Sequence, residues 1–192
     1  MYIAIEGIDT AGKSTQIEKL KEHFPYAVVT KEPGGTEIGK KIREIVLSAK
    51  TKSKKAEFLL FLADRAEHIK EIIEPNKDKF IISDRSAISG IAYALAQGEI
   101  EKKDLVWLNH FATNGIYPQK VFLLHLSKEE LEFRLSQKKL DGIELRGASY
   151  LLNIQKAIIE AAKLLDIDLV IIDAKKSINE IRDEILNNIR RC

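Results

Sequence analysis

The chain has 192 residues, 45% of them hydrophobic and 31% charged, a composition typical of one ordinary globular domain with a sizeable core. Its 31 basic and 29 acidic residues nearly balance, at a formal net charge of +2, so we expect no nucleic-acid partner. No apolar run approaches the roughly 18 residues that span a bilayer, so we expect no membrane partner either. The one cysteine, Cys192, allows no intrachain disulfide, and no basic segment precedes the apolar N-terminus; both features favour the cytoplasm.

Short apolar runs alternate with amphipathic stretches along the chain. The first predicted strand covers residues 2–5, and a helix follows whose apolar face carries Ile17, Leu20 and Phe24. Further strands are predicted at residues 27–30, 80–83, 120–125 and 169–172. All are short and apolar on both faces, which is typical of strands buried in a parallel sheet.

Helix signals fill the segments between these strands. Two four-residue segments, 127–130 and 177–180, have the Ser-x-x-Glu spacing of a capping box and predict helix starts. The last helix has an apolar face made by Ile178, Ile181, Ile185, Leu186 and Ile189. This alternation predicts a single α/β domain over residues 1–192, with a doubly wound, parallel five-stranded sheet flanked by helices. A polar stretch at about 135–147 is expected to form a short lid.

The glycine-rich segment after the first strand matches the phosphate-loop pattern G-x-x-x-x-G-K-[ST] in full. We expect the nucleotide cofactor to contact Gly7, Ile8, Asp9, Thr10, Ala11, Gly12, Lys13, Ser14 and Thr15. Glycines let the backbone bend around phosphate oxygens, and the N–H groups at the following helix start point at the anion. Lys13 supplies a cation for the β- and γ-phosphates, and the Ser14 hydroxyl is a Mg²⁺ ligand.

A second signal lies at the end of the strand at residues 80–83, where Asp84 follows the apolar run. A carboxylate in this position beside a phosphate loop holds Mg²⁺ directly or through water. Because ligands bind at the carboxyl ends of strands in such sheets, Asp84 and Lys13 should converge.

Two other classes of phosphate-loop protein are weaker alternatives. A GTPase switch needs an Asn-Lys-x-Asp guanine reader, and the nearest match, residues 76–79, ends in lysine. It also needs an Asp-x-x-Gly segment after Asp84, which the chain lacks. A regulatory module that binds phosphate without catalysis is disfavoured by the density of potential catalytic groups.

Four segments together resemble the thymidylate kinase family along nearly the whole chain. They are residues 5–16, the Lys-Glu-Pro-Gly-Gly-Thr segment 31–36, the segment 60–68, and Ser83-Asp84-Arg85 with Ser89 and Tyr93. The resemblance implies the reaction ATP + dTMP → ADP + dTDP with Mg²⁺, which supplies dTTP synthesis. It also implies a homodimer.

The resemblance also implies roles for individual residues at the acceptor site. Asp9 would accept a hydrogen bond from the sugar 3′-hydroxyl, Phe61 would stack on thymine, and Arg65 would donate to a base carbonyl. Ser89 and Tyr93 would lie along the deoxyribose, where the bulk of Tyr93 excludes a 2′-hydroxyl.

Three more residues complete the implied acceptor site. Arg85 would clamp the acceptor phosphate through its fork of donors. Glu32, followed by Pro33, would position Mg²⁺, its waters or the loop itself.

The chain departs from the family pattern where the transferring phosphoryl group is stabilised. Thr10 stands where the phosphate loop of relatives has glycine or arginine, and the lid is short and lysine-rich. The candidates for the stabilising cation are Arg134 and Arg146, with Lys138 and Lys139 as weaker ones. Because Ala94 replaces a family glutamine near the base, a kinase for another nucleoside monophosphate on the same fold remains the alternative.

Overall fold

The computed structural model describes residues 1–48, 51–137 and 147–190. In these residues a parallel five-stranded sheet has the order β2-β3-β1-β4-β5. Its strands are β1 (Tyr2–Glu6), β2 (Val28–Lys31), β3 (Ile81–Asp84), β4 (Lys120–His125) and β5 (Asp168–Asp173). The predicted fold class is confirmed, and the strand bounds agree with the sequence prediction within a residue at each end.

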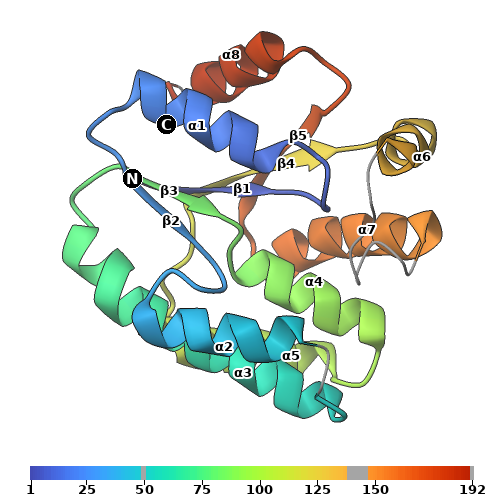
Figure 1. The fold of residues 1–192 in the computed structure, drawn as a ribbon. Helices are drawn as coiled ribbons and strands as arrows, with labels where there is room; N and C mark the ends of the chain where they lie inside the picture. The colour runs from blue at the N-terminus through green and yellow to red at the C-terminus, as the bar shows by residue number, and fades with distance from the viewer. Residues whose placement is uncertain (49–50, 138–146, 191–192) are drawn as a thin grey trace.

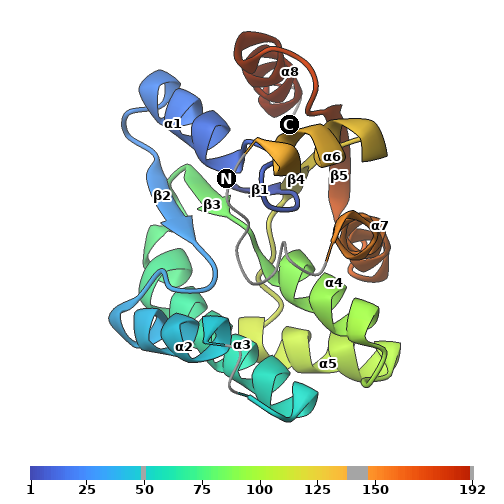
Figure 2. The same ribbon diagram turned by 45° about the vertical axis from the view of Figure 1, so that its right-hand side comes forward.

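Helices cover both faces of this sheet, as Figure 1 shows. On one face α1 (Lys13–His23) packs against α8 (Ile178–Ile189). On the other, α4 (Ala87–Gln97) packs against α7 (Ala148–Leu164), α3 (Lys54–His68) and α5 (Lys102–Thr113). In the view of Figure 2, α2 (Glu37–Leu47) lies beside α3, and α6 (Lys128–Ser136) stands near the end of β4. A π-helical turn, η1 (Ile69–Ile73), and a 3₁₀ turn, η2 (Glu74–Asn76), lead from α3 toward β3.

The strand register brings the site residues to one edge of the sheet. Asp84 of β3 pairs with Ile5 of β1 on one side and with Lys31 of β2 on the other. The phosphate loop leaves β1 immediately after Glu6, and Glu32 follows Lys31. The carboxyl ends of three adjacent strands therefore deliver the polar residues that sequence spacing alone places far apart.

Burial of both faces is confirmed for the central strands but is wrong for the edge strands. The residues of β1 are all buried, whereas β2 alternates between half-buried and exposed positions and Ile171 of β5 is 48% exposed. An edge strand has a neighbour on one side only, and the flanking helices cover it less completely. Ile178, expected on the apolar face of α8, is likewise 49% exposed at the first turn.

The two predicted capping boxes have different outcomes. At α8, Ser177 Oγ accepts from the Glu180 N–H (3.3 Å) and the Glu180 carboxylate accepts from the Ser177 N–H (2.9 Å), so that box is confirmed. At α6, Ser127 Oγ accepts from the Glu130 N–H (3.2 Å), but the Glu130 carboxylate accepts from Arg134 instead (2.7 Å). Competition from a cation one turn away explains why the second box is only half formed.

The predicted lid begins in a helix. Residues 135 and 136 belong to the last turn of α6, and Gly147 caps the start of α7, while residues 138–146 lie outside the described part of the chain. Within the described ranges, every helix is too short or too polar to cross a bilayer.

Candidate active site

The predicted phosphate loop is a tight turn between β1 and α1. Gly7, Thr10 and Gly12 all have positive φ angles, of 152°, 70° and 96°. A Cβ atom at Gly7 would lie 3.0 Å from the carbonyl oxygen of Leu124, so only glycine lets the loop approach β4 this closely. The loop turns the first N–H groups of α1 outward at the carboxyl edge of the sheet, which is the arrangement an anion requires.

Lys13 lies within this loop and is nearly buried, with 8% of its surface exposed. Its Nζ donates to the carbonyl oxygen of Ile8 at 3.1 Å and lies 3.8 Å from Asp9 Oδ1. Burial and the nearby Arg85 cation lower the pKa of Lys13 to about 8. The structure therefore holds a cation at the phosphate position at a considerable desolvation cost.

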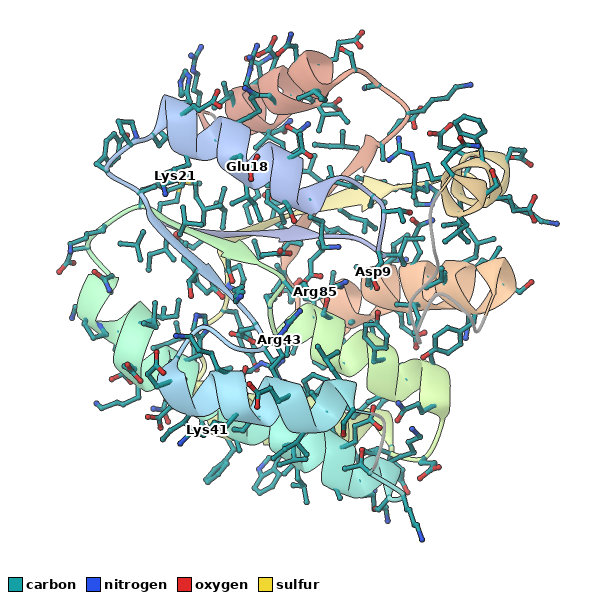
Figure 3. The ribbon with its side chains drawn as sticks, in the orientation of Figure 1. Asp9, Glu18, Lys21, Lys41, Arg43 and Arg85 are labelled. Atoms are coloured by element: carbon teal, nitrogen blue, oxygen red, sulfur yellow. The ribbon has the colours of Figure 1, made fainter. Side chains whose placement is uncertain are left out.

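Asp9 and Arg85 form an ion pair across the site, with Arg85 Nη2 and Asp9 Oδ1 2.8 Å apart. Arg85 Nη1 also donates to the Gly7 carbonyl (3.0 Å) and to Ser89 Oγ (3.1 Å). The two residues face each other between the phosphate loop and α4 in Figure 3. The predicted phosphate clamp and the predicted sugar acceptor thus neutralise each other.

Glu6, which the sequence analysis left without a role, is a fully buried carboxylate at the end of β1. Its oxygens accept hydrogen bonds from Ser86 Oγ (2.9 Å) and Ser89 Oγ (2.5 Å). Burial raises the pKa of Glu6. Because the Ser89 hydroxyl donates its proton to Glu6, its oxygen is oriented to accept the hydrogen bond from Arg85 Nη1. The signal that could have identified Glu6 is a carboxylate at a position where the strand is otherwise apolar.

The predicted metal ligands lie at the same edge. Asp84 Oδ1 is buried and has no hydrogen-bond partner in the described ranges, while Ser14 is exposed in the first turn of α1. A buried carboxylate oxygen without a donor is suited to a cation. No group of three His, Cys, Asp or Glu side chains forms a metal cage in the part of the chain that is described. The pair therefore fits Mg²⁺, which uses few protein carboxylates and takes its other ligands from phosphates and water.

A cavity of about 420 Å³ lies between α3 and α4, next to the Asp9–Arg85 ion pair. Each helix contributes residues spaced four apart, which places them on one face. Those from α3 are Glu57, Phe61 and Arg65, and those from α4 are Ser89, Tyr93 and Gln97. Burial raises the pKa of Tyr93 to about 12, so it remains a neutral phenol. Asp9, Arg85, Glu32 and Pro33 also line this cavity, which thus brings together all the predicted acceptor-site residues.

The structure pairs the Glu32 side chain with two other protein side chains. Its backbone N–H donates to the Asp84 carbonyl oxygen (3.0 Å), but its carboxylate turns to Arg65 Nε (2.9 Å) and His68 Nδ1 (2.8 Å). Both carboxylate oxygens are thus engaged by protein groups, and a role of Glu32 in positioning Mg²⁺, its waters or the loop stays a prediction. The linear motif could not distinguish these uses, because Arg65 lies 33 residues further along the chain.

Arg134, a predicted stabilising cation, is bound to backbone rather than free. Besides Glu130, its guanidinium donates to the carbonyl oxygens of Thr10 (2.9 Å) and Ala174 (2.6 Å). It therefore connects α6 to the phosphate loop and to the turn after β5. The other candidates, Lys138, Lys139 and Arg146, lie outside the described residues.

Several cavity residues were not singled out from the sequence. Arg43 of α2 also lines the cavity and donates through Nη1 to the Pro33 carbonyl oxygen at 2.9 Å; Figure 3 shows it on the same side of the molecule as Arg85 and Asp9. Gln97 of α4 lies two turns beyond Ser89 and donates to Glu57 (3.3 Å). Four-residue spacing from a predicted site residue is the sequence signal that would have included Gln97.

Comparisons with known proteins agree on one family. The family model described as thymidylate kinase matches residues 5–185. The chain is 73% identical to the thymidylate kinase of Sulfurimonas denitrificans over 98% of this chain and 99% of that one. It is 56% identical to the enzyme of Aliarcobacter butzleri over 94% of each. The crystal structure of thymidylate kinase from Ehrlichia chaffeensis has a TM-score of 0.78 at 26% identity and covers 99% of this chain and 98% of that chain.

Proposed function

Since the chain belongs to the thymidylate kinase family and its reaction is the phosphorylation of dTMP to dTDP, we propose that the cavity between α3 and α4 binds dTMP while the phosphate loop binds ATP with Mg²⁺. The observation that carries this assignment is the single cavity that joins Asp9 and Arg85 at one end to Phe61 and Arg65 further along. A phosphate, a sugar and a base in that order match this sequence of charged, polar and aromatic groups.

The acceptor phosphate replaces Asp9 as the partner of Arg85. The 2.8 Å ion pair with Asp9 holds the Arg85 guanidinium close to the position that a bidentate contact with a phosphate needs. Once released, Asp9 accepts from the sugar 3′-hydroxyl, and Ser89, held by Glu6, keeps the guanidinium in place. Phe61 stacks on thymine, Arg65 donates to a base carbonyl, and Tyr93 fills the space where a ribose 2′-hydroxyl would lie.

Catalysis rests on positioning and charge neutralisation. An oxygen of the dTMP phosphate attacks the γ-phosphorus of ATP as the bond to the β–γ bridging oxygen breaks, and ADP leaves. Lys13 neutralises charge on the β- and γ-phosphates. When bound, Mg²⁺ supplies further neutralisation, and Asp84 and Ser14 would hold it. An arginine beside or within the lid segment, Arg134 or Arg146, completes the cation set.

The partner proposed for the outer helices is a second copy of the chain. Leu59 of α3 is 56% exposed, and on the neighbouring α5 Trp107 and Phe111 are 64% and 73% exposed. The two aromatic rings stack with centroids 6.0 Å apart. Large aromatic side chains on adjacent helices are typical of a protein interface. Use of ATP as donor, together with a single cysteine, supports the cytoplasm as the compartment.

The test is a phosphoryl-transfer assay with Mg²⁺, ATP and a panel of ribo- and deoxyribonucleoside monophosphates. We expect dTMP to have the highest kcat/KM, dUMP to follow, and purine nucleotides to be poor acceptors because they exceed the space facing Phe61. An Asp84→Asn variant should need a higher Mg²⁺ concentration for half-maximal rate. A purine or ribonucleotide preferred over dTMP would contradict the assignment of the cavity.

A further inference from the structure

Arg65 is held by a frame of buried groups. Its side chain is 2% exposed; Nε donates to Glu32 Oε2 at 2.9 Å and Nη1 donates to Asn109 Oδ1 at 2.6 Å. The Asn109 amide is oriented in turn by its own donation to the Leu105 carbonyl oxygen (2.7 Å). Two of the three guanidinium nitrogens are thus fixed by protein acceptors: Glu32, which directly follows β2, and Asn109 of α5.

Glu32 is fixed by a second partner on the opposite side. His68 Nδ1 lies 2.8 Å from Glu32 Oε1, and His68 Nε2 lies 2.7 Å from Thr30 Oγ1. Burial disfavours the charged carboxylate, but Arg65 and the His68 hydrogen bond outweigh it and keep the pKa of Glu32 below its usual value. A carboxylate that accepts from Nδ1–H leaves Nε2 of a neutral imidazole to accept from the Thr30 hydroxyl. Each group in this chain therefore has a defined donor or acceptor role.

The third guanidinium nitrogen of Arg65, Nη2, differs from the other two in its surroundings. No protein acceptor binds it within the described ranges, and Arg65 lines the cavity. Gly90 of α4 lies directly against it: a Cβ atom at position 90 would be 2.7 Å from Nη2. Arginine tips usually move aside at little cost, but this one is anchored at Nε and Nη1. The absence of a side chain at position 90 is therefore what leaves Nη2 its place.

We propose that Glu32 is a positioning residue which, with His68, Asn109 and Gly90, holds Arg65 so that Nη2 alone is presented to the 4-keto oxygen of the acceptor base. This inference rests on the proposed contact between Arg65 and the base. The keto oxygen at position 4 lies on the side of the pyrimidine away from the sugar, as Arg65 lies beyond the clamp that binds the phosphate. A cytosine carries an amino donor at that position, which a fixed N–H donor rejects.

A merely structural ion pair would not need this arrangement. Removing two buried charges from water is expensive, and a buried pair is weak evidence of stabilisation in itself. Arginine carries considerable side-chain entropy, so a mobile guanidinium would lose that entropy on each binding event. Fixing two of its nitrogens in advance leaves one donor with a single direction, which is what discrimination between a keto and an amino group requires.

The experiment compares two acceptors, dTMP and 5-methyl-2′-deoxycytidine monophosphate, which differ at position 4 of the base. Variants Glu32→Ala, Glu32→Gln, Gly90→Ala and Arg65→Lys are assayed for kcat/KM with each acceptor, for KM of ATP, and for thermal unfolding. Glu44→Gln, on the exposed face of α2, is the matched control for loss of a carboxylate.

We expect Glu32→Ala and Gly90→Ala each to lower the preference for dTMP by about tenfold, the scale of one hydrogen bond to a charged group, while KM for ATP is unchanged. Glu32→Gln, which keeps an acceptor for Nε, should recover part of the preference. Gly90→Ala keeps every hydrogen-bonding group of the frame, and its thermal unfolding shows whether the variant is folded despite the added Cβ contact with Nη2. A structural role would instead reduce turnover of both acceptors equally.

Two outcomes overturn distinct parts of the argument. If Arg65→Lys abolishes the preference while Glu32→Ala and Gly90→Ala retain it, the base contact holds and the positioning role is wrong. If Arg65→Lys also retains the preference, the proposed base contact itself is wrong. Should Glu32→Ala fail to fold, Gly90→Ala decides, since it leaves every hydrogen-bonding group of the frame in the chain.

Discussion

At the scale of single residues, the cavity combines groups with opposite demands. Phe61 supplies an apolar face, while Asp9 and Arg85 are charged groups that the protein partly buries; Lys13 lies next to Asp9 in the phosphate loop. Each charged side chain has an oppositely charged protein partner, which offsets part of the cost of its burial.

Phe61→Ala should weaken dTMP binding by about 1–3 kcal/mol, the range found when an aromatic side chain that stacks on a base is removed. The affinity for ATP should be unchanged, because Phe61 lines the cavity and not the phosphate loop. Isothermal titration with each nucleotide separately measures both constants. Equal losses for the two ligands would show that Phe61 acts through the general core.

Lys13 should give the free enzyme a titration near pH 8, because burial and Arg85 lower its pKa to about 8. Below that pH the ammonium is charged and attracts ATP; as the pH rises through 8 the charge is lost, so kcat/KM for ATP should fall. At saturating ATP, bound phosphates favour the ammonium form, and the fall in kcat should lie at higher pH. Lys13→Arg, which keeps its charge, should remove the alkaline limb near pH 8. A wild-type kcat/KM that is flat from neutral pH into the alkaline range would contradict the assignment.

At the scale of elements, α6 is connected to the catalytic edge through one side chain. Arg134 joins α6 to the Thr10 and Ala174 carbonyl oxygens, which belong to segments 124 and 40 residues away. The segment 127–130 was expected to start a helix, and Arg134 lies in the last turn of that helix, α6. Its role toward the transferring phosphoryl group stays a prediction.

We expect Arg134→Ala to lower kcat by more than about tenfold with both substrates saturating, which corresponds to more than about 1.4 kcal/mol. Arg134→Lys should restore little, since an ammonium cannot reach two carbonyl oxygens in the fork geometry of arginine. Arg146→Ala, measured in the same way, tells which arginine contributes more. If neither alanine variant loses more than tenfold, Lys13, Arg85 and Mg²⁺ suffice for the chemistry.

At the scale of the whole molecule, the doubly wound sheet separates two surfaces. One edge, formed by the ends of β1, β2 and β3, carries the phosphate loop and the cavity. The outer surface formed by α3 and α5 carries exposed apolar side chains. The opposite face of α3 lines the cavity. A partner on the outer face would therefore support the wall that holds Phe61 and Arg65.

The protein should sediment at about twice its chain mass of 21.7 kDa. Trp107→Glu and Phe111→Glu should each shift it toward the monomer, because a carboxylate buried at an apolar contact is strongly unfavourable. Ile178→Glu, at an exposed apolar position on α8, is the matched control and should leave the mass unchanged. Sedimentation velocity over a range of concentrations makes the measurement, and a monomeric wild-type protein at micromolar concentration would contradict the proposed interface.

Much of this protein follows from local sequence alone. The phosphate loop is recognised from glycine and lysine at fixed spacing, because its positive φ angles and the helix start are local features, although the need for glycine at position 7 also reflects Leu124 of β4. The strands follow from short apolar runs, and the capping box at Ser177 from two residues three apart. The family resemblance also follows from such segments, since each of its motifs spans only a short stretch of the chain.

The tertiary structure decided which partner each charged side chain takes. The Glu32 carboxylate pairs with Arg65, and Arg134 binds carbonyl oxygens of two distant segments. It also decided that β2 and β5 lie at the sheet edges and are partly exposed. Strand order and helix packing bring together residues that are tens of positions apart, and a buried charge is satisfied by whichever group that packing places within hydrogen-bonding distance.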